Sequence, residues 1–228
     1  MTRNLRLHYA PDNASLCVRL ALEELGLPYD TVLVDRRARA QKAPPFLALN
    51  PNGLIPVLET PQGPIFETAA ILMWLAETQG RLMPPVGAPE RMHAIQWMIW
   101  LANTLHPTLR MMFYPDQYAD GDSGPTHRMA GQRLRAHLDL LAEAATVPWL
   151  EEDGASIHAC YLAPMLRWVA LYGGGDVWFD LAEWPRLCAF AKRMEARDSV
   201  IRAAIAEGLG PTPFSLTSPC NPLEGSAL

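Results

Sequence analysis

From Asn50 to Thr68 the chain reads Asn-Pro-Asn-Gly-Leu-Ile-Pro-Val-Leu-Glu-Thr-Pro-Gln-Gly-Pro-Ile-Phe-Glu-Thr, and this stretch decides the fold. Asn-Pro and Asn-Gly at its start predict a turn. Two short apolar runs, Val57-Leu58 and Ile65-Phe66, are separated by Pro-Gln-Gly-Pro, which is typical of a tight β-hairpin. Pro56 stands just before the first strand, where a missing backbone N–H is tolerated. The stretch therefore predicts a turn, two short strands and then a helix.

The two ends of this stretch have the features of a peptide-binding site. The bond between Ile55 and Pro56 is a candidate cis peptide. A cis bond turns the backbone N–H and C=O of Ile55 outward, where an extended peptide pairs with them as an added strand does. At the other end, Glu67 and Thr68 begin a helix, and a helix N-terminus favours a carboxylate. We therefore expect a site for a small acidic peptide.

Two motifs in the stretch resemble those of a known family. Residues 50–56 follow the pattern Asn-Pro-x-Gly-x-[Ile/Val]-Pro, and residues 67–71 follow Glu-[Ser/Thr]-x-Ala-Ile at the start of a helix. In this order and at this spacing, they resemble the glutathione-binding half of the bacterial and other cytosolic glutathione transferases. The resemblance extends over nearly the whole chain, except for about the last twenty residues.

The rest of the chain predicts an α/β thioredoxin-like N-terminal domain (βαβαββα) followed by an all-α helical-bundle C-terminal domain. The first domain covers residues 1–80, and a linker with three prolines covers 81–89. The second covers 90–228, with an extended tail from about 208. Its predicted helices are Glu90 to about Tyr118, bent at Pro107, then His127 to Ala145, Ser156 to Leu171 and Leu181 to Ala206.

Composition excludes several classes of protein. Half of the residues are hydrophobic, as in a globular protein. The net charge of −5 argues against binding to nucleic acid, which needs concentrated positive charge. No apolar run approaches the roughly 20 residues that cross a membrane. The four cysteines show neither CxxC nor metal-ligand spacing, so we expect no metal and a reduced, cytoplasmic location.

The resemblance implies a residue that activates the thiol of glutathione, because the thiolate is the nucleophile. Ser15 stands where the family keeps a serine or cysteine, although it is also a suitable helix N-cap. Asn13, as an amide donor, and Tyr9, through its phenol, are alternatives. Ala14 occupies the position of the cysteine that forms a mixed disulfide in some bacterial members. Cys17 lies about 200° round the helix from Ser15, so we expect it to be a buried small hydrophobe.

The resemblance also implies the contacts with glutathione, the co-substrate. Glu67 and Thr68 are expected to hold the γ-glutamyl end, and the backbone of Ile55 to pair with the cysteinyl unit. Gln41 or Lys42 is expected to meet the glycine carboxylate, although Lys42 is equally well explained as a solvated charge. The predicted glutathione-binding residues are Gln41, Lys42, Leu54, Ile55, Pro56, Glu67 and Thr68.

A second substrate is expected between the domains, against the first long helix. His106 and Arg110 are four residues apart and share a face, and Phe113 and Tyr114 follow. Such a patch suits a flat electrophile, although ordinary packing between domains explains it as well. The predicted function is conjugation of glutathione to a small apolar or aromatic electrophile, in a homodimer that takes part in detoxification. The alternatives are a non-catalytic protein-interaction module and a glutathione-dependent thiol–disulfide oxidoreductase.

Overall fold

A four-stranded sheet with the order β2-β1-β3-β4 forms the centre of the N-terminal part. The structure is a computed structural model that describes residues 5–143, 147–151, 154–172 and 178–227. β1 and β2 are parallel, whereas β3 is antiparallel to both β1 and β4. The strands are β1 (Leu5–Tyr9), β2 (Tyr29–Leu33), β3 (Val57–Thr60) and β4 (Gly63–Phe66).

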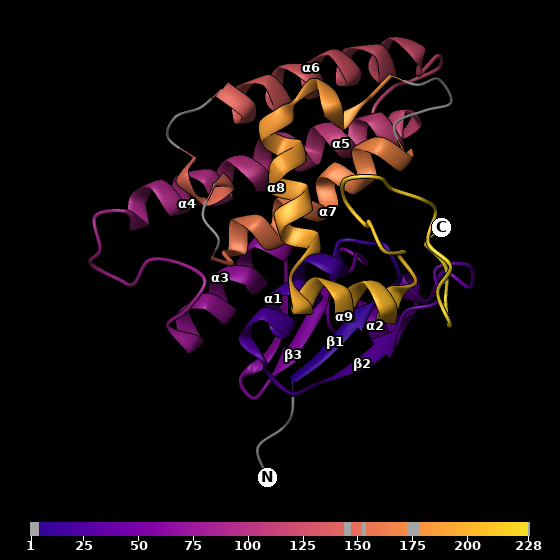
Figure 1. Cartoon of the computed structure of the whole chain (residues 1–228). Coiled ribbons are helices and arrows are strands. Elements are labelled where there is room, and N and C mark those ends of the chain that lie inside the picture. The colour runs from indigo at the N-terminus through magenta and orange to yellow at the C-terminus, as the bar shows by residue number, and fades with distance from the viewer. Residues whose placement is uncertain (1–4, 144–146, 152–153, 173–177, 228) are drawn as a thin grey trace.

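Helices cover both faces of the sheet. α1 (Ser15–Leu25) makes the crossover that the parallel pair β1 and β2 requires. It ends at Gly26, whose φ of 66° allows the left-handed C-terminal cap that the sequence predicts. α1 and α3 (Thr68–Gln79) lie between the sheet and the other helices (Figure 1). The short helix α2 (Pro44–Leu47) covers the opposite face, where Phe46 packs with Val34 and Val57. The thioredoxin-like fold predicted from the sequence is confirmed.

The C-terminal part is helical, as predicted (Figure 1). The first long helix is divided into α4 and α5 by a π-helical segment, Leu101–Leu105, in which His106 N–H bonds to the carbonyl of Leu101. This wider turn directly precedes Pro107, whose ring and missing N–H disturb a regular helix. The helices are α4 (Arg91–Trp100), α5 (His106–Phe113), α6 (Gly124–Glu143), α7 (Ile157–Tyr172), α8 (Pro185–Glu195) and α9 (Asp198–Glu207).

The single helix predicted over residues 181–206 is wrong. The structure has a short 3₁₀ turn, Leu181–Glu183, and then the separate helices α8 and α9. Arg197, between them, is extended with φ −84° and ψ 136°. Its guanidinium binds both carboxylate oxygens of Glu24 on α1, at 2.5 and 2.9 Å. The break thus turns α9 against α1, a tertiary effect that helical periodicity does not reveal. The predicted helix end at Ala145 lies outside the described residues.

The tail after Gly208 is irregular but packed. Leu209 and Phe214 are buried, and the carboxylate of Glu195 accepts hydrogen bonds from the N–H groups of Phe214 and Ser215 at 2.6 Å. In Figure 1 the tail, drawn in yellow, runs down beside the β2 side of the sheet. Among the described helices, none combines the length and the apolar character that a membrane crossing requires.

Candidate active site

One edge of the sheet gathers the segments that carry the predicted site residues. β1 ends beside the end of β2, with Tyr9 opposite Leu33. β3 begins at the same edge, with Val57 opposite both His8 of β1 and Phe66 at the end of β4. The segments that enter or leave the sheet here are 9–15, 34–42, 50–56 and 67–68. They contain every predicted catalytic and glutathione-binding residue.

The turn before β3 is held by Asn50, which is 2% exposed. Its side-chain amide donates to the carbonyl of Leu54 at 2.7 Å, and its side-chain oxygen accepts from the N–H of Asn52 at 3.0 Å. The Ile55–Pro56 bond that follows is cis. Leu54 is 44% exposed, whereas Pro56 is buried. The turn therefore presents Leu54 and the half-buried Ile55 at the sheet edge, as a peptide ligand requires.

The N-terminus of α3 lies at the same edge of the sheet, where β4 ends. Glu67 precedes the helix with a φ of 73°, and its side chain is exposed. Thr68, the first helical residue, is 6% exposed. The first N–H groups of a helix have no partners within it and attract negative charge. The start of α3 therefore has the electrostatic character that favours a carboxylate, beside the turn at Ile55.

Gln41 and Lys42 differ in their surroundings. The side-chain oxygen of Gln41 is buried and lacks a hydrogen-bond partner among the described residues. Such an acceptor is costly to leave unpaired, so it suits an N–H donor of a ligand. Lys42 is exposed, and its ammonium donates to the carbonyl of Asn52 at 3.1 Å, on the turn before β3. The ammonium of Lys42 therefore lies at the same edge, beside the turn before β3.

The hydroxyl groups of Ser15 and Tyr9 both donate hydrogen bonds to acceptors within the protein. Ser15 is fully buried, and its hydroxyl donates to the carbonyl of Ala10 at 3.1 Å while accepting from the N–H of Ala10 at 3.3 Å. Tyr9 donates to the carboxylate of Glu224 at 2.6 Å. Burial and the Glu224 carboxylate raise the pKa of Tyr9. Cys17 is fully buried too, and burial raises the pKa of its thiol. None of these three groups presents a free donor or thiolate to a ligand in this arrangement.

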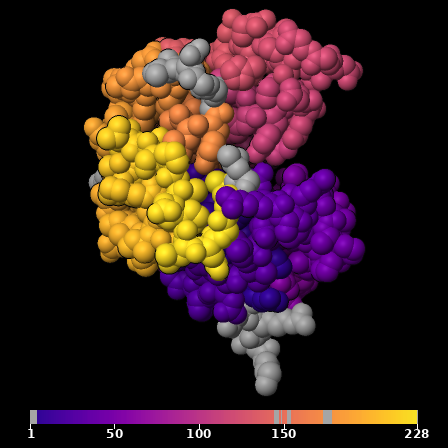
Figure 2. Space-filling view, turned by 90° about the vertical axis from the view of Figure 1, so that its right-hand side faces the viewer, coloured from indigo at the N-terminus to yellow at the C-terminus, as the bar shows by residue number. Residues whose placement is uncertain are grey.

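Asn13 is the half-buried member of the predicted trio. Its amide nitrogen donates to the carbonyls of Pro11 at 2.8 Å and Ala227 at 3.1 Å. Its oxygen accepts from Arg36 at 2.9 Å, and Arg36 also donates to Ala227. The tail thus binds the loop after β1, and Figure 2 shows it (yellow) beside the hollow between the sheet domain and the helical domain.

The predicted second-substrate residues form a patch along α5 and directly after it, in which Arg110, Phe113 and Tyr114 contact one another. The guanidinium of Arg110 lies 5.7 Å from the centre of the Tyr114 ring, and Phe113 packs on Tyr114 with centroids 6.5 Å apart. The ring of His106 bonds through Nδ1 to the hydroxyl of Tyr161 at 2.9 Å. Burial, and then the charge of Arg110, lower the pKa of His106 to about 4, so it is neutral at pH 7. The only cation in this patch at pH 7 is therefore Arg110.

Sequence reasoning missed the residues that connect this patch to the loop after β1. Tyr172 of α7 packs on Phe113, with centroids 6.0 Å apart, and its hydroxyl donates to Asp12 at 2.6 Å. Arg167 of the same helix forms an ion pair with Asp12, at 2.8 Å. These partners are separated by 155 and 160 residues in the sequence. No short-range motif signals them, although a basic residue inside the apolar helix α7 was an observable anomaly.

Comparison with known proteins agrees with this geometry. A family profile described as "Glutathione S-transferase, N-terminal domain" matches residues 14–78. The chain is 30% identical to the glutathione S-transferase GstA of Escherichia coli O157:H7, over 90% of this chain and 100% of that protein. The chain belongs to the glutathione transferase family. Glutathione transferases are enzymes, so the predicted enzyme class is confirmed as well.

Two further relatives are a solved glutathione transferase homologue and a disulfide-bond oxidoreductase. A glutathione transferase homologue from Sulfitobacter, solved with bound glutathione, superposes with a TM-score of 0.76 at 26% identity, over 87% of this chain and 96% of that one. The disulfide-bond oxidoreductase YfcG of Escherichia coli K12 is 28% identical, over 90% of this chain and 96% of that protein. Among the described residues, no group of three or more His, Cys, Asp or Glu side chains is arranged to hold a metal ion.

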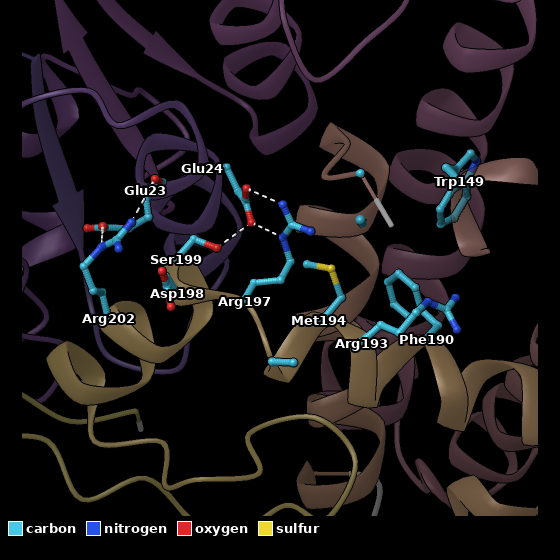
Figure 3. Close-up of a pocket in the computed structure, with 13 residues that line it drawn as sticks. Glu23, Glu24, Trp149, Phe190, Arg193, Met194, Arg197, Asp198, Ser199 and Arg202 are labelled. Atoms are coloured by element: carbon cyan, nitrogen blue, oxygen red, sulfur yellow. Dashed lines mark hydrogen bonds and ion pairs between the residues drawn. The ribbon is translucent and has the colours of Figure 1, made fainter. Parts of the chain in front are cut away.

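A cavity of the transferase lies away from this edge, at the other end of α1. It has a volume of about 650 Å³ and lies among α1, α8 and α9. Figure 3 shows that ion pairs cross it, Glu24 with Arg197 and Glu23 with Arg202. None of the predicted site residues lines this cavity.

Proposed function

We propose that this transferase conjugates the thiolate of glutathione to a small apolar or aromatic electrophile. The observation that carries the proposal is the convergence at one sheet edge of the turn at Ile55, the start of α3 and the loop with Asn13. The aromatic patch on α5 borders that loop, since Phe113 packs on Tyr172, which binds Asp12. A peptide thiol held along the turn therefore lies between its activating loop and an apolar surface.

Within this proposal, Asn13 is a better activator than Ser15 or Tyr9. The single proton of Ser15 goes to Ala10, and that of Tyr9 goes to Glu224, whereas an amide has two N–H groups. One N–H of Asn13 holds the loop through Pro11, and the other bonds to Ala227 of the tail. We infer that the thiolate replaces Ala227 as the acceptor. A charge-assisted bond is worth about 1.5–3 kcal/mol, enough to lower a thiol pKa by about 1–2 units.

The test is the pH dependence of thiolate formation, followed by the ultraviolet absorbance of bound glutathione. In Asn13→Ala the midpoint moves up by about 1 unit or more, because the thiolate loses its donor. Ser15→Ala serves as the matched variant, and its midpoint stays within a few tenths of a unit. The reverse pattern would return the role to Ser15. If calorimetry with the wild-type enzyme detects no glutathione binding, the proposal fails as a whole.

A second candidate function is reduction of disulfides with glutathione, which the similarity to the oxidoreductase YfcG favours. In this chain the reaction would use the thiol of glutathione itself, because Cys17, the cysteine of the N-terminal sheet domain, is fully buried and burial raises the pKa of its thiol. Turnover of a small mixed disulfide that persists in Cys17→Ala, and exceeds turnover of an aromatic electrophile, would favour this function over conjugation.

We also propose that the enzyme is a cytoplasmic homodimer, as is typical of the family. Exposed apolar side chains on and before α4 are available for a subunit contact: Val86 is 81%, Met92 74% and Ile99 47% exposed. Met92 and Ile99 are seven residues apart, so they share a face of the helix. Light scattering after size exclusion tests the proposal, since a monomeric mass at micromolar concentration would contradict it.

A further inference from the structure

Asp12 is a buried carboxylate in the loop between β1 and α1, one residue before Asn13. Its side chain has no exposed surface. Arg167 of α7 binds both of its oxygens, at 2.8 and 3.0 Å. The indole N–H of Trp168 donates to it at 3.0 Å, and the hydroxyl of Tyr172 at 2.6 Å. Four donors fill the acceptor capacity of a carboxylate, so Asp12 has nothing left for a substrate.

The backbone at Asp12 is fixed as well. Its φ of 52° lies in the left-handed region, which residues other than glycine seldom adopt. Its N–H donates to the carboxylate of Glu207 at 2.8 Å. Glu207 is fully buried at the end of α9 and also binds Arg19 of α1, at 2.7 Å. Two helices of the C-terminal domain, α7 and α9, thus hold the loop in a conformation that it would not keep alone.

The residues that hold Asp12 also touch the aromatic patch and the tail. Trp168 lies against His106, with centroids 5.8 Å apart, and Tyr172 lies against Phe113. Arg167 donates to the tail through the carbonyls of Pro213 at 3.1 Å and Ser218 at 2.8 Å. α7 therefore contacts the loop, the patch and the tail together.

We propose that Asp12 is a positioning residue, through which α7 holds the Asn13 amide in place for the bound thiol. The inference rests on the proposed function. A buried ion pair adds little stability beyond that of an apolar pair of similar volume, because desolvation offsets the attraction. The ion pair of Asp12 with Arg167 instead holds the loop in a single conformation. A preorganised donor stabilises an anion better than a mobile one does.

The experiment uses Tyr172→Phe, which removes one donor to Asp12 and keeps the ring and the Arg167 ion pair. We expect the midpoint of thiolate formation to rise by about 0.5 pH unit, with the dissociation constant of glutathione changed by less than about twofold. The matched control is Ser199→Ala, which removes a hydroxyl–carboxylate bond to Glu24 at the opposite end of α1. Its midpoint stays at the wild-type value even if its melting temperature falls.

Combining Tyr172→Phe with Asn13→Ala tests whether Asp12 acts on the thiol through Asn13. If Asp12 acts through Asn13, the double variant has the midpoint of Asn13→Ala alone, because the two effects are not additive. Additive shifts, or a Tyr172→Phe midpoint equal to that of the control, would overturn the inference. Should Tyr172→Phe fold poorly, Trp168→Phe removes a different donor and is read in the same way. Failure of the proposed function is distinct, since calorimetry with the wild-type enzyme would then detect no glutathione binding.

Discussion

At the scale of single residues, burial decides which polar groups can change charge. His158 is 2% exposed, stacks on Trp149 with centroids 5.1 Å apart, and donates from Nε2 to the carbonyl of Ala94 at 2.7 Å. Burial lowers its pKa to about 4, against the opposing effect of the Ala94 carbonyl. A neutral imidazole satisfies this site, whereas an imidazolium would be a buried charge with no compensating carboxylate bond.

This predicts a loss of stability in mild acid. Because the folded pKa lies below the unfolded value of about 6.5, the unfolded chain takes up the proton first as the pH falls. The free energy of unfolding therefore decreases between about pH 6.5 and 4, by up to about 3 kcal/mol from this residue. Urea unfolding of the wild type and of His158→Gln at several pH values measures this contribution, as the part of the pH dependence that His158→Gln removes.

The control for that experiment is His93→Gln. His93 lies on α4 beside Ala94, the partner of His158, but its side chain is exposed. Glu207 acts in the opposite sense, since burial raises its pKa to about 7 against the opposing charge of Arg19. The free energies of unfolding of variant and wild type are therefore compared at each pH, because Glu207 contributes equally to both. Equal slopes for wild type and His158→Gln would contradict the assignment.

At the scale of elements, the start of α7 is determined by a hydrogen bond between residues that are close in the sequence. The hydroxyl of Ser156 accepts a hydrogen bond from the N–H of Ala159 at 3.1 Å, so Ser156 caps the start of α7. α7 is the helix that holds Asp12, and it lies in the core shared by both domains. Its N-terminus is therefore a point at which stability can be lowered without touching the active site.

We expect Ser156→Ala to lower the free energy of unfolding by about 1 kcal/mol, because the N–H of Ala159 loses its acceptor in a buried setting. Chemical denaturation measures the change. Ser123→Ala is the control, since at the start of α6 the backbone carbonyl of Ser123, which the substitution keeps, accepts the bond from His127. A loss of equal size in both variants would mean that the cap contributes nothing specific.

At the scale of the whole molecule, the tail joins the two domains across the β2 side of the sheet (Figure 1). Gly225 allows a close approach there, because its φ is 76° and a Cβ at this position would lie 2.6 Å from a methyl group of Leu33. Glu224 and Ala227 on either side bind Tyr9 and Asn13. The tail therefore depends on a glycine to reach the loop after β1.

Gly225→Val should detach this part of the tail, because the larger side chain cannot fit against Leu33. We expect limited proteolysis of the tail to be at least about tenfold faster than in the wild type, since cleavage follows the population of the open form. Gly121→Val has a similar φ of 89° but open space around it, and controls for backbone strain. Equal cleavage rates in the two variants would exclude the contact with Leu33 as the cause.

Much of the fold was predictable because its signals are local. The hairpin, the glycine that ends α1 and the start of α3 each depend on residues within a few positions of one another. The division at residues 196–197 was not predictable, since it serves the pairing of Arg197 with Glu24, 173 residues away. For the same reason the sequence identified Ser15, Asn13 and Tyr9 as candidates but does not show that Ser15 donates to Ala10 and Tyr9 to Glu224.

The sequence by itself determined the family, the sheet with its hairpin, and the segments that meet at the edge of the sheet. It did so because turns, caps and strand periodicity depend on residues that are neighbours in the sequence. Tertiary structure alone decided where each polar group of the site finds its partner. The protons of Ser15 and Tyr9 go to Ala10 and Glu224, and Asp12 takes its four donors from α7. The physical reason is that a buried polar group bonds to whichever donor or acceptor the packing brings near, however distant in the chain.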